Sequence, residues 1–161
     1  MTEEKRMLLE RKKAMQDARN RMKLIDGQGL EVFDIFEENT KPTLGKVMFQ
    51  RCATNYPMNV PAENKISEDV SEEELFAWIA EKLDLVEGKE YFYYCSGMWA
   101  VIKINKLFPA IKNMWFHDTL ERGIGCLGFL LVDLESNRVL EVGSDSRDEE
   151  NYLIDIFDGT L

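Results

Sequence analysis

The feature of the sequence that most restricts the possible folds is two pairs of apolar segments in the second half of the chain. Within each pair, a short turn sequence separates the two segments. Residues 91–95 (YFYYC) and 98–104 (MWAVIKI) are separated by two small residues, which predicts a β-hairpin. Residues 128–134 (GFLLVDL) and 138–143 (RVLEVG) flank a Ser-Asn turn at 136–137 and predict a second hairpin. Because 98–104 is apolar on both faces, we expect it to be a central, covered strand.

Helical patterns surround these hairpins along the chain. Residues 71–83 predict a helix, because their first four residues, Ser-Glu-Glu-Glu, form a capping box in front of an apolar face. A weaker helix is predicted over 43–53. A further helix over 107–116 is expected to begin near Pro109, with His117 at its C-terminal end, where a cation suits the helix dipole.

The end of the chain repeats the capping pattern. Ser-Arg-Asp-Glu at 146–149 predicts the start of a terminal helix, and Gly159 would end it. Its inner face would carry Tyr152, Leu153, Ile156 and Phe157.

Residues 3–25 predict one N-terminal helix, because apolar residues recur at three-, four- and seven-residue steps. This stripe consists of Leu8, Met15, Ala18, Met22 and Ile25. It is either a short coiled-coil seam or a face that packs on the rest of the protein. The opposite, basic face could then lie against the acidic remainder of the chain.

The whole pattern predicts an α+β fold: an antiparallel sheet built from two hairpins, with helices packed on one face and preceded by an N-terminal helix. Two segments are less regular. Residues 30–36 fit a strand or a short helix, and 54–66, with two prolines and three asparagines, predict a loop. Residues 1–27 form a basic helix that could be an appendage, and residues 28–161 are expected to form a single α+β domain.

Charge is distributed unevenly along the chain. The net charge is −10, from 20 basic and 30 acidic residues. Residues 1–25 hold eight basic and four acidic residues, or +4, which leaves 12 basic and 26 acidic residues, or −14, for the remainder. Such a body repels phosphates, so we expect no direct nucleic-acid binding. It favours a basic protein partner with fast, salt-sensitive association, although solubility alone would explain the same charge.

Length and composition exclude several classes of protein. A chain of 161 residues with 45% hydrophobic content fits one ordinary globular domain. No apolar run approaches the ~20 residues of a membrane span, and the start lacks the apolar core of a signal peptide. Three widely spaced cysteines form no disulfide framework. We therefore expect a reduced, cytoplasmic protein without membrane association.

Residues that carry chemistry are sparse. The soft metal ligands are Cys52, Cys95, Cys126 and His117. Their spacing matches no zinc motif. His117 beside Asp118 could start a nucleophilic site only if folding brings Ser96 or Cys95 near. We expect no catalytic residue, no metal and no cofactor. The alternative is an enzyme or small-ligand protein with a pocket near His117, Cys95 and Trp99.

Two further segments have both a functional and a structural interpretation. Residues 143–150 (GSDSRDEE) lack the alternation of an EF-hand, so calcium is not expected. They form either a capped helix start or an acidic contact surface at a sheet edge. The aromatic run 91–94 with Trp99 could stack bases, but it has few basic neighbours, so packing within the sheet is expected.

Several of these features recur together in one family. A helix at 71–83, an aromatic strand at 91–95 and Gly128 precede the hairpin 131–139 (LVDLESNRV). Gly143-Ser144 and then Tyr152-Leu153-Ile154 follow it. With these motifs, about residues 70–158 resemble the YrhB-like family of small α+β immunity proteins from bacterial toxin systems.

The resemblance implies a non-catalytic immunity protein that binds one cognate toxin in the producing cell and neutralises it. An acidic inhibitor suits a basic toxin such as a nuclease. We expect toxin contacts at Asp133, Glu135, Asp145, Asp148, Glu149 and Glu150. One alternative is a phage-encoded inhibitor of a host defence nuclease complex. Another is a structural subunit that self-assembles through the 3–25 helix.

Overall fold

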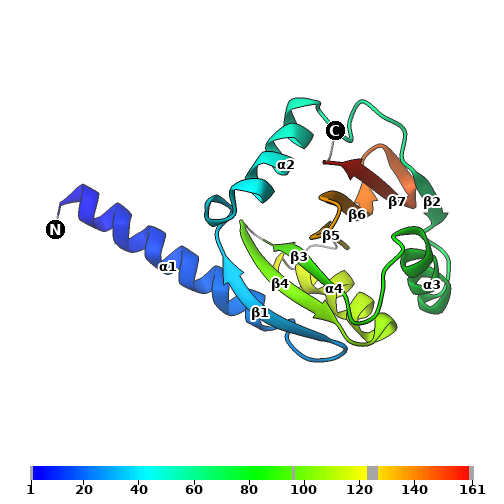
Figure 1. Cartoon of the computed structure of the whole chain (residues 1–161), viewed down its shortest axis with the longest axis horizontal. Helices are drawn as coiled ribbons and strands as arrows, with labels where there is room; N and C mark the ends of the chain where they lie inside the picture. Colours follow the sequence, from blue (N-terminus) through cyan, green and yellow to red (C-terminus); the bar gives the residue numbers. More distant parts are fainter. Residues whose placement is uncertain (1, 96, 123–126, 160–161) are drawn as a thin grey trace.

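Seven strands form one sheet in a computed structural model that describes residues 2–95, 97–122 and 127–159, with only the backbone described at 118–122. The strands are β1 (Leu30–Phe36), β2 (Asn64–Ser67), β3 (Glu90–Cys95), β4 (Met98–Ile104), β5 (Gly128–Asp133), β6 (Arg138–Asp145) and β7 (Asp148–Asp158). The helices are α1 (Glu3–Lys23), a 3-10 turn η1 (Glu38–Thr40), α2 (Pro42–Ala53), α3 (Glu72–Lys82) and α4 (Leu107–Arg122). The order in the sheet is β1-β4-β3-β5-β6-β7-β2, and each neighbouring pair is antiparallel (Figure 1).

The predicted α+β fold with an antiparallel sheet and an N-terminal helix is confirmed. The two predicted hairpins are β3–β4 and β5–β6, and they lie side by side because β3 also pairs with β5. Asn137 in the β5–β6 turn has φ of 57°, a conformation that asparagine tolerates better than most residues. Strand β4 lies between β1 and β3 and is covered, as expected.

The predicted terminal helix is wrong, because residues 148–158 form β7, which pairs with β6 and β2. Tyr152 and Ile154 pack on one face of the sheet, and Phe157 packs on the other. A strand buried on both faces has a continuous apolar run, which also fits helical spacing. Instead of capping a helix, residues 146 and 147 form the turn between β6 and β7.

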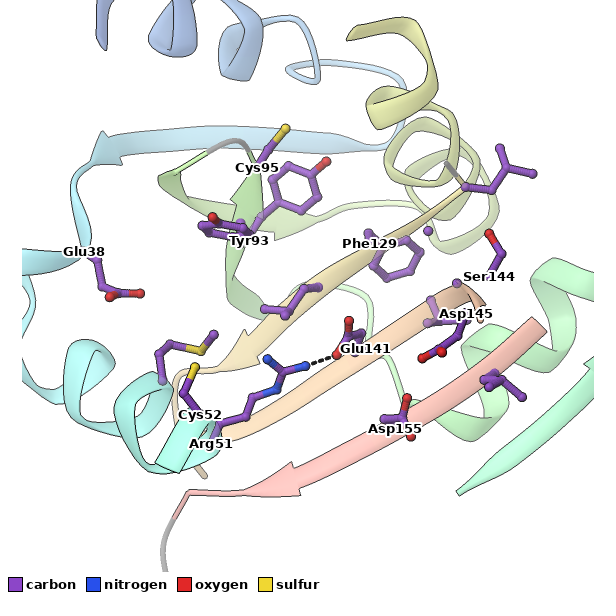
Figure 2. A pocket seen from close by; sticks show the side chains of 18 of the residues that line it. Glu38, Arg51, Cys52, Tyr93, Cys95, Phe129, Glu141, Ser144, Asp145 and Asp155 are labelled. Atoms are coloured by element: carbon purple, nitrogen blue, oxygen red, sulfur yellow. Dashed lines mark hydrogen bonds and ion pairs between the residues drawn. The ribbon is translucent and has the colours of Figure 1, made fainter. Parts of the chain in front are cut away.

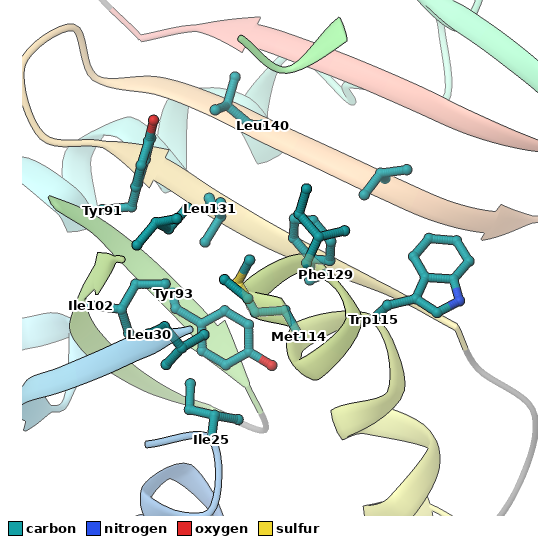
Figure 3. Close-up of a cluster of buried hydrophobic side chains, with 14 of the residues drawn as sticks. Ile25, Leu30, Tyr91, Tyr93, Ile102, Met114, Trp115, Phe129, Leu131 and Leu140 are labelled. Carbon is teal, nitrogen blue, oxygen red and sulfur yellow. The ribbon is translucent and has the colours of Figure 1, made fainter. Parts of the chain in front are cut away.

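The larger core lies on one face of the sheet, under α3, α4 and the C-terminal end of α1. Buried side chains of this core include Ile25, Leu30, Tyr91, Tyr93, Ile102, Met114, Trp115, Phe129, Leu131 and Leu140 (Figure 3). Two of the four aromatic residues in the run 91–94 are therefore core residues, as expected, while Tyr94 remains partly exposed. In α3 the Ser71 hydroxyl accepts a hydrogen bond from the Glu74 backbone N–H, so the predicted N-cap is confirmed.

Helix α2 covers part of the opposite face, so the sheet is not covered on one face alone. Leu44 and Val47 of α2 pack with Trp99, Val132 and Val139 in a smaller apolar cluster. The rest of this face, toward the β6–β7 turn, carries charged side chains. The candidate functional site lies on this part of the face, between α2 and the β6–β7 turn.

Helix α1 joins the body only through its C-terminal part. Ala18 and Met22 are buried, whereas Leu8 is 52% exposed and its neighbours Met7 and Leu9 are exposed as well. Figure 1 shows the helix extending away from the sheet toward the N-terminus. The packing interpretation therefore holds for the last turns, and the basic N-terminal turns do not lie against the acidic remainder.

The structure settles one open local prediction and corrects two others. Residues 30–36 form a strand with a bulge between Val32 and Asp34, and the extra residue, Phe33, breaks the alternation that would have identified it. The predicted loop 54–66 runs into β2, which begins at Asn64. Helix α4 extends to Arg122, so His117 lies inside the helix and not at its C-terminal end. Among the described residues, no helix is long and apolar enough to span a membrane.

Candidate functional site

The six acidic residues predicted as toxin contacts lie in two groups at opposite ends of β6. Asp133 and Glu135 are at the β5–β6 turn, while Asp145 and the segment 148–150 are at the β6–β7 turn. Strand β6 has eight residues, so its ends are about 23 Å apart at roughly 3.3 Å per residue. The structure therefore does not bring the six residues into one patch.

At the first end, Asp133 is already paired. Its carboxylate accepts a hydrogen bond from Lys89 at 2.7 Å and another from the Glu135 backbone N–H at 2.9 Å. Burial acts to raise the pKa of Asp133, but the Lys89 ammonium and the backbone donors outweigh it and hold the pKa below its usual value. Glu135 is exposed and lies 3.8 Å from the same ammonium. This end is an ion-pair cluster in which one ammonium is shared by two carboxylates.

At the second end, Arg147 connects the turn to the sheet. Its guanidinium donates to Asp145 at 2.9–3.0 Å and to Asp155 on β7 at 2.5 Å. It also donates to the carbonyl oxygens of Pro57 and Val60, at 3.1 and 3.2 Å, and so holds the preceding loop against the hairpin. Burial acts to raise the pKa of Asp145, but the Arg147 hydrogen bonds hold it below its usual value. Asp145 is therefore engaged within the fold.

Beyond this turn, an exposed acidic edge forms where β2 meets β7. We define the acidic edge as Glu68, Asp69, Glu149 and Glu150, all of which are exposed. The Glu68 backbone N–H donates to the Glu150 carbonyl at 3.1 Å, which places the two acidic segments side by side. Asp148 begins β7 beside them, and its carboxylate accepts from the Glu150 N–H and the Asn151 side chain. Three of the six predicted residues thus share one edge with acids that were not predicted as contacts.

A groove with a volume of about 860 Å³ lies between α2 and the sheet and reaches the β6–β7 turn (Figure 2). Its wall on the helix side includes Phe49, Arg51 and Cys52, and its floor is formed by β3, β5, β6 and β7. The charged residues that line it are Glu38, Arg51, Glu141, Asp145 and Asp155. Because Arg147 binds Asp145 and Asp155 from the turn, four carboxylates are matched by two guanidinium groups, and the groove is acidic. Its volume lies within the range of about 300–1,000 Å³ that ligand sites occupy.

Glu141 and Arg51 form an ion pair across the groove (Figure 2). The Arg51 side chain is mostly buried, whereas Glu141 keeps part of its carboxylate exposed to the groove. Burial raises the pKa of Glu141 above its usual value, and the nearby Asp155 carboxylate adds to this effect although Arg51 opposes it. The ionised form of Glu141 is therefore held at a cost.

That cost arises from strand register, because Glu141 is paired directly with Asp155 across β6 and β7. Side chains at directly opposed positions share a face of the sheet, and like charges there are destabilising. Asp155 is 4% exposed, and its Oδ2 atom binds Arg147. Its Oδ1 atom is buried and has no hydrogen-bond partner among the described residues. A buried carboxylate oxygen left unpaired is costly, so it needs an explanation.

Tyr56 lies beside this pair and experiences its charge. Its hydroxyl donates to the Ile156 carbonyl at 2.7 Å. Burial and the nearby Asp155 carboxylate together raise the pKa of Tyr56 to about 12. The phenol is therefore a neutral hydrogen-bond donor at ordinary pH and supplies no base for chemistry.

The residues of the predicted alternative pocket are not brought together. Trp99 belongs to the α2 face of the sheet and its indole N–H donates to Glu38 at 3.2 Å, whereas Cys95 and His117 lie on the other side. His117 is buried, with Nε2 2.9 Å from the Arg21 carbonyl and Nδ1 2.9 Å from the Tyr93 hydroxyl. Because a carbonyl only accepts, Nε2 carries the hydrogen, and in the neutral ring Nδ1 accepts from Tyr93. This arrangement ties α4 to α1 and β3.

Metal-binding groups are not found either, within the described part of the chain. No set of three or more His, Cys, Asp and Glu side chains there could hold a metal ion. Cys52 is an exposed free thiol and Cys95 a buried one. Ser96, Cys126 and the Asp118 side chain lie outside what the structure describes.

Sequence reasoning missed the residues that shape the groove, namely Arg51, Glu141, Arg147 and Asp155. Two of them carried a usable signal. Glu141 interrupts the apolar run of β6, and Asp155 interrupts that of β7, and a charge inside a buried strand is rarely tolerated without a partner. Arg51 carried no such signal, because it lies in a segment that reads as an ordinary amphipathic helix.

Comparison of this chain with protein-family models, with curated proteins and with solved structures gives no match.

Proposed function

We propose that this protein is a non-catalytic inhibitor, an immunity protein that binds and neutralises a basic toxin in the producing cell. The observation that carries the proposal is the concentration of carboxylates at one end of the sheet. There the acidic edge and the acidic groove meet at the β6–β7 turn, with Asp145 on the groove side and Asp148 paired with it on the other strand. The motif resemblance of residues 70–158 supports the same class of function.

The physical basis is electrostatic steering. A body of −14 attracts a basic partner over long distances, and an exposed cluster of like charges fixes the orientation of the encounter. The acidic edge suits this role because Glu68, Asp69, Glu149 and Glu150 are exposed. Asp133 and Glu135, at the other end of β6, stay a separate prediction, since Lys89 neutralises much of that site.

The test is co-purification of tagged protein from the cells that produce it, at low and moderate salt, followed by mass spectrometry. We expect one stoichiometric basic protein whose recovery decreases with salt. Charge reversal of the acidic edge, with E68K, E149K and E150K combined, should abolish the recovery. A control with E4K, E10K and E81K changes the net charge equally at exposed positions on α1 and α3 and should retain it.

Two outcomes would overturn the proposal. One is the absence of a stoichiometric partner at either salt concentration. The other is an equal loss of partner recovery with the edge variant and with the control. That result would show that net charge, and not the position of the acidic edge, determines binding. The identity of a captured protein also separates the toxin inhibitor from the alternative: a secreted or self-produced toxin fits the first, and a defence nuclease complex fits a phage-encoded inhibitor.

A further inference from the structure

The groove beneath α2 contains a charge network that lacks one cation. Among the described side chains, Glu141, Asp145 and Asp155 are matched by Arg51 and Arg147. Three carboxylates against two guanidinium groups leave one negative charge without a partner. The Oδ1 atom of Asp155 has no hydrogen-bond partner among the described residues, so it is an acceptor that a further cation could bind.

The direct opposition of Glu141 and Asp155 in this network is not explained by a contribution to stability. Directly opposed carboxylates on adjacent strands repel each other, and replacing either by an apolar residue would fit the neighbouring apolar positions of β6 and β7. Local arrangements that weaken a fold are concentrated at sites where another molecule supplies the missing interaction. A third cation placed over the Glu141–Asp155 pair would supply it.

The geometry points to a binding site for a guanidinium group here, from an arginine-bearing segment of the basic partner, seated over Glu141 and Asp155. A guanidinium suits the site better than an ammonium for two reasons. It donates several hydrogen bonds in one plane, so it can bind two neighbouring carboxylates at once. It also stacks on aromatic rings, and Tyr94 and Phe49 line the same groove and are partly exposed.

The size of the groove agrees with a segment of chain around that arginine. Its volume of about 860 Å³ exceeds what one side chain fills. The groove reaches Asp145, which is paired with Asp148 next to the acidic edge, so a partner steered to the edge could place one basic side chain into the groove. This inference rests on the proposed function in assuming a basic protein partner, but the site can be tested without that partner.

The experiment titrates the full-length, ¹⁵N-labelled protein with the peptide acetyl-Gly-Arg-Gly-amide and follows backbone and arginine side-chain NMR signals. We expect saturable shifts at residues 141–145 and 153–155 and at the Nε–H groups of Arg51 and Arg147. The matched peptide with citrulline, which has the same shape without the charge, should give none. Equal shifts with both peptides, or shifts confined to the acidic edge, would overturn the inference.

Variants then locate the site. D155N should weaken binding of the peptide at least tenfold, and E10Q, an exposed position on the projecting turns of α1, should leave the affinity for the peptide unchanged. Because D155N could also disturb folding through Arg147, E141Q serves as a second variant with the same expected loss. Unchanged affinity in folded E141Q and D155N would overturn the inference.

Failure of this site and failure of the proposed function give different results. A partner that co-purifies through the acidic edge but binds D155N and E141Q as tightly as the natural chain would reject the groove alone. Arginine-peptide binding at the groove, without any partner in the cells, would reject the inhibitor and retain the cation site.

Discussion

Glu141 and Asp155 face each other directly across strands β6 and β7, and each is bound by a different arginine. Arg51 reaches Glu141 from α2, and Arg147 reaches Asp155 from the β6–β7 turn. The helix, the turn and two strands are therefore connected through a single repulsive pair. The position of α2 over the sheet depends on charge here and on apolar packing at its other end.

We expect E141Q to stabilise the fold by about 0.2–1 kcal/mol at neutral pH, the usual size of a cross-strand charge effect. The raised pKa of Glu141 means that the folded state favours the protonated form. The contribution of Glu141 to stability therefore decreases as pH rises from the unfolded pKa, about 4.3, through the folded pKa. Urea unfolding at several pH values checks this, because the advantage of E141Q should grow from pH ~4 to neutral pH.

A constant difference between E141Q and the natural chain over this pH range would contradict that account, since it would assign the effect to packing. E150Q is the control, because it removes an exposed carboxylate on the same hairpin. Its unfolding free energy should differ from that of the natural chain by less than about 0.5 kcal/mol at each pH.

We expect R147M to destabilise the protein by about 3 kcal/mol, because it leaves Asp145 and Asp155 without their shared cation and releases the loop at Pro57 and Val60. In an R147M/D155N double variant much of this loss should be recovered, since the more deeply buried of the two uncompensated carboxylates is gone and only the more exposed Asp145 remains. Urea unfolding of the two single variants and the double variant gives the coupling energy. Additive losses would show that Arg147 acts through the loop and not through Asp155.

The fold could be predicted from sequence where local signals agree with packing. The Ser71 cap, the Ser-Asn turn and the apolar run of β4 each act within a few residues, and each was confirmed. Strand β7 was misassigned because the apolar residues on its two faces, read together, imitate helical spacing. Only pairing with β6 and β2, across separations of up to about ninety residues, decides whether this segment forms a helix or a strand.

The candidate site was less predictable than the fold, for a physical reason. The acidic residues of 148–150 stand out in the sequence because they are adjacent, and the structure does place them at an exposed edge. The groove, by contrast, depends on register: Glu141 meets Asp155 only when β6 and β7 pair in one particular alignment. Arg51 joins them from a helix ninety residues earlier, and sequence spacing does not encode that contact.

The Lys89–Asp133 pair provides a separate prediction on pH dependence. The pKa of Asp133 lies below its usual value, so the stabilisation is present above the unfolded pKa and is lost as pH falls through the folded pKa. We expect D133N to lose about 1 kcal/mol at neutral pH, because the pair is only partly shielded from solvent. The deficit should shrink as pH falls below about 3.9, and urea unfolding in acid would detect this. A deficit that persists in acid would assign the effect to the backbone hydrogen bonds of the turn.

The last prediction concerns α1, where two residues at the same position of the seven-residue repeat differ in environment. Met22 is buried against the body, whereas Leu8 is exposed on the projecting turns. M22A should therefore cost about 2–5 kcal/mol, and L8A less than about 0.5 kcal/mol, by urea unfolding. If L8A instead destabilises the protein in a concentration-dependent way, the projecting turns are covered by a second copy. In that case the coiled-coil seam considered for residues 3–25 would be the correct interpretation, because only association makes an exposed leucine contribute to stability.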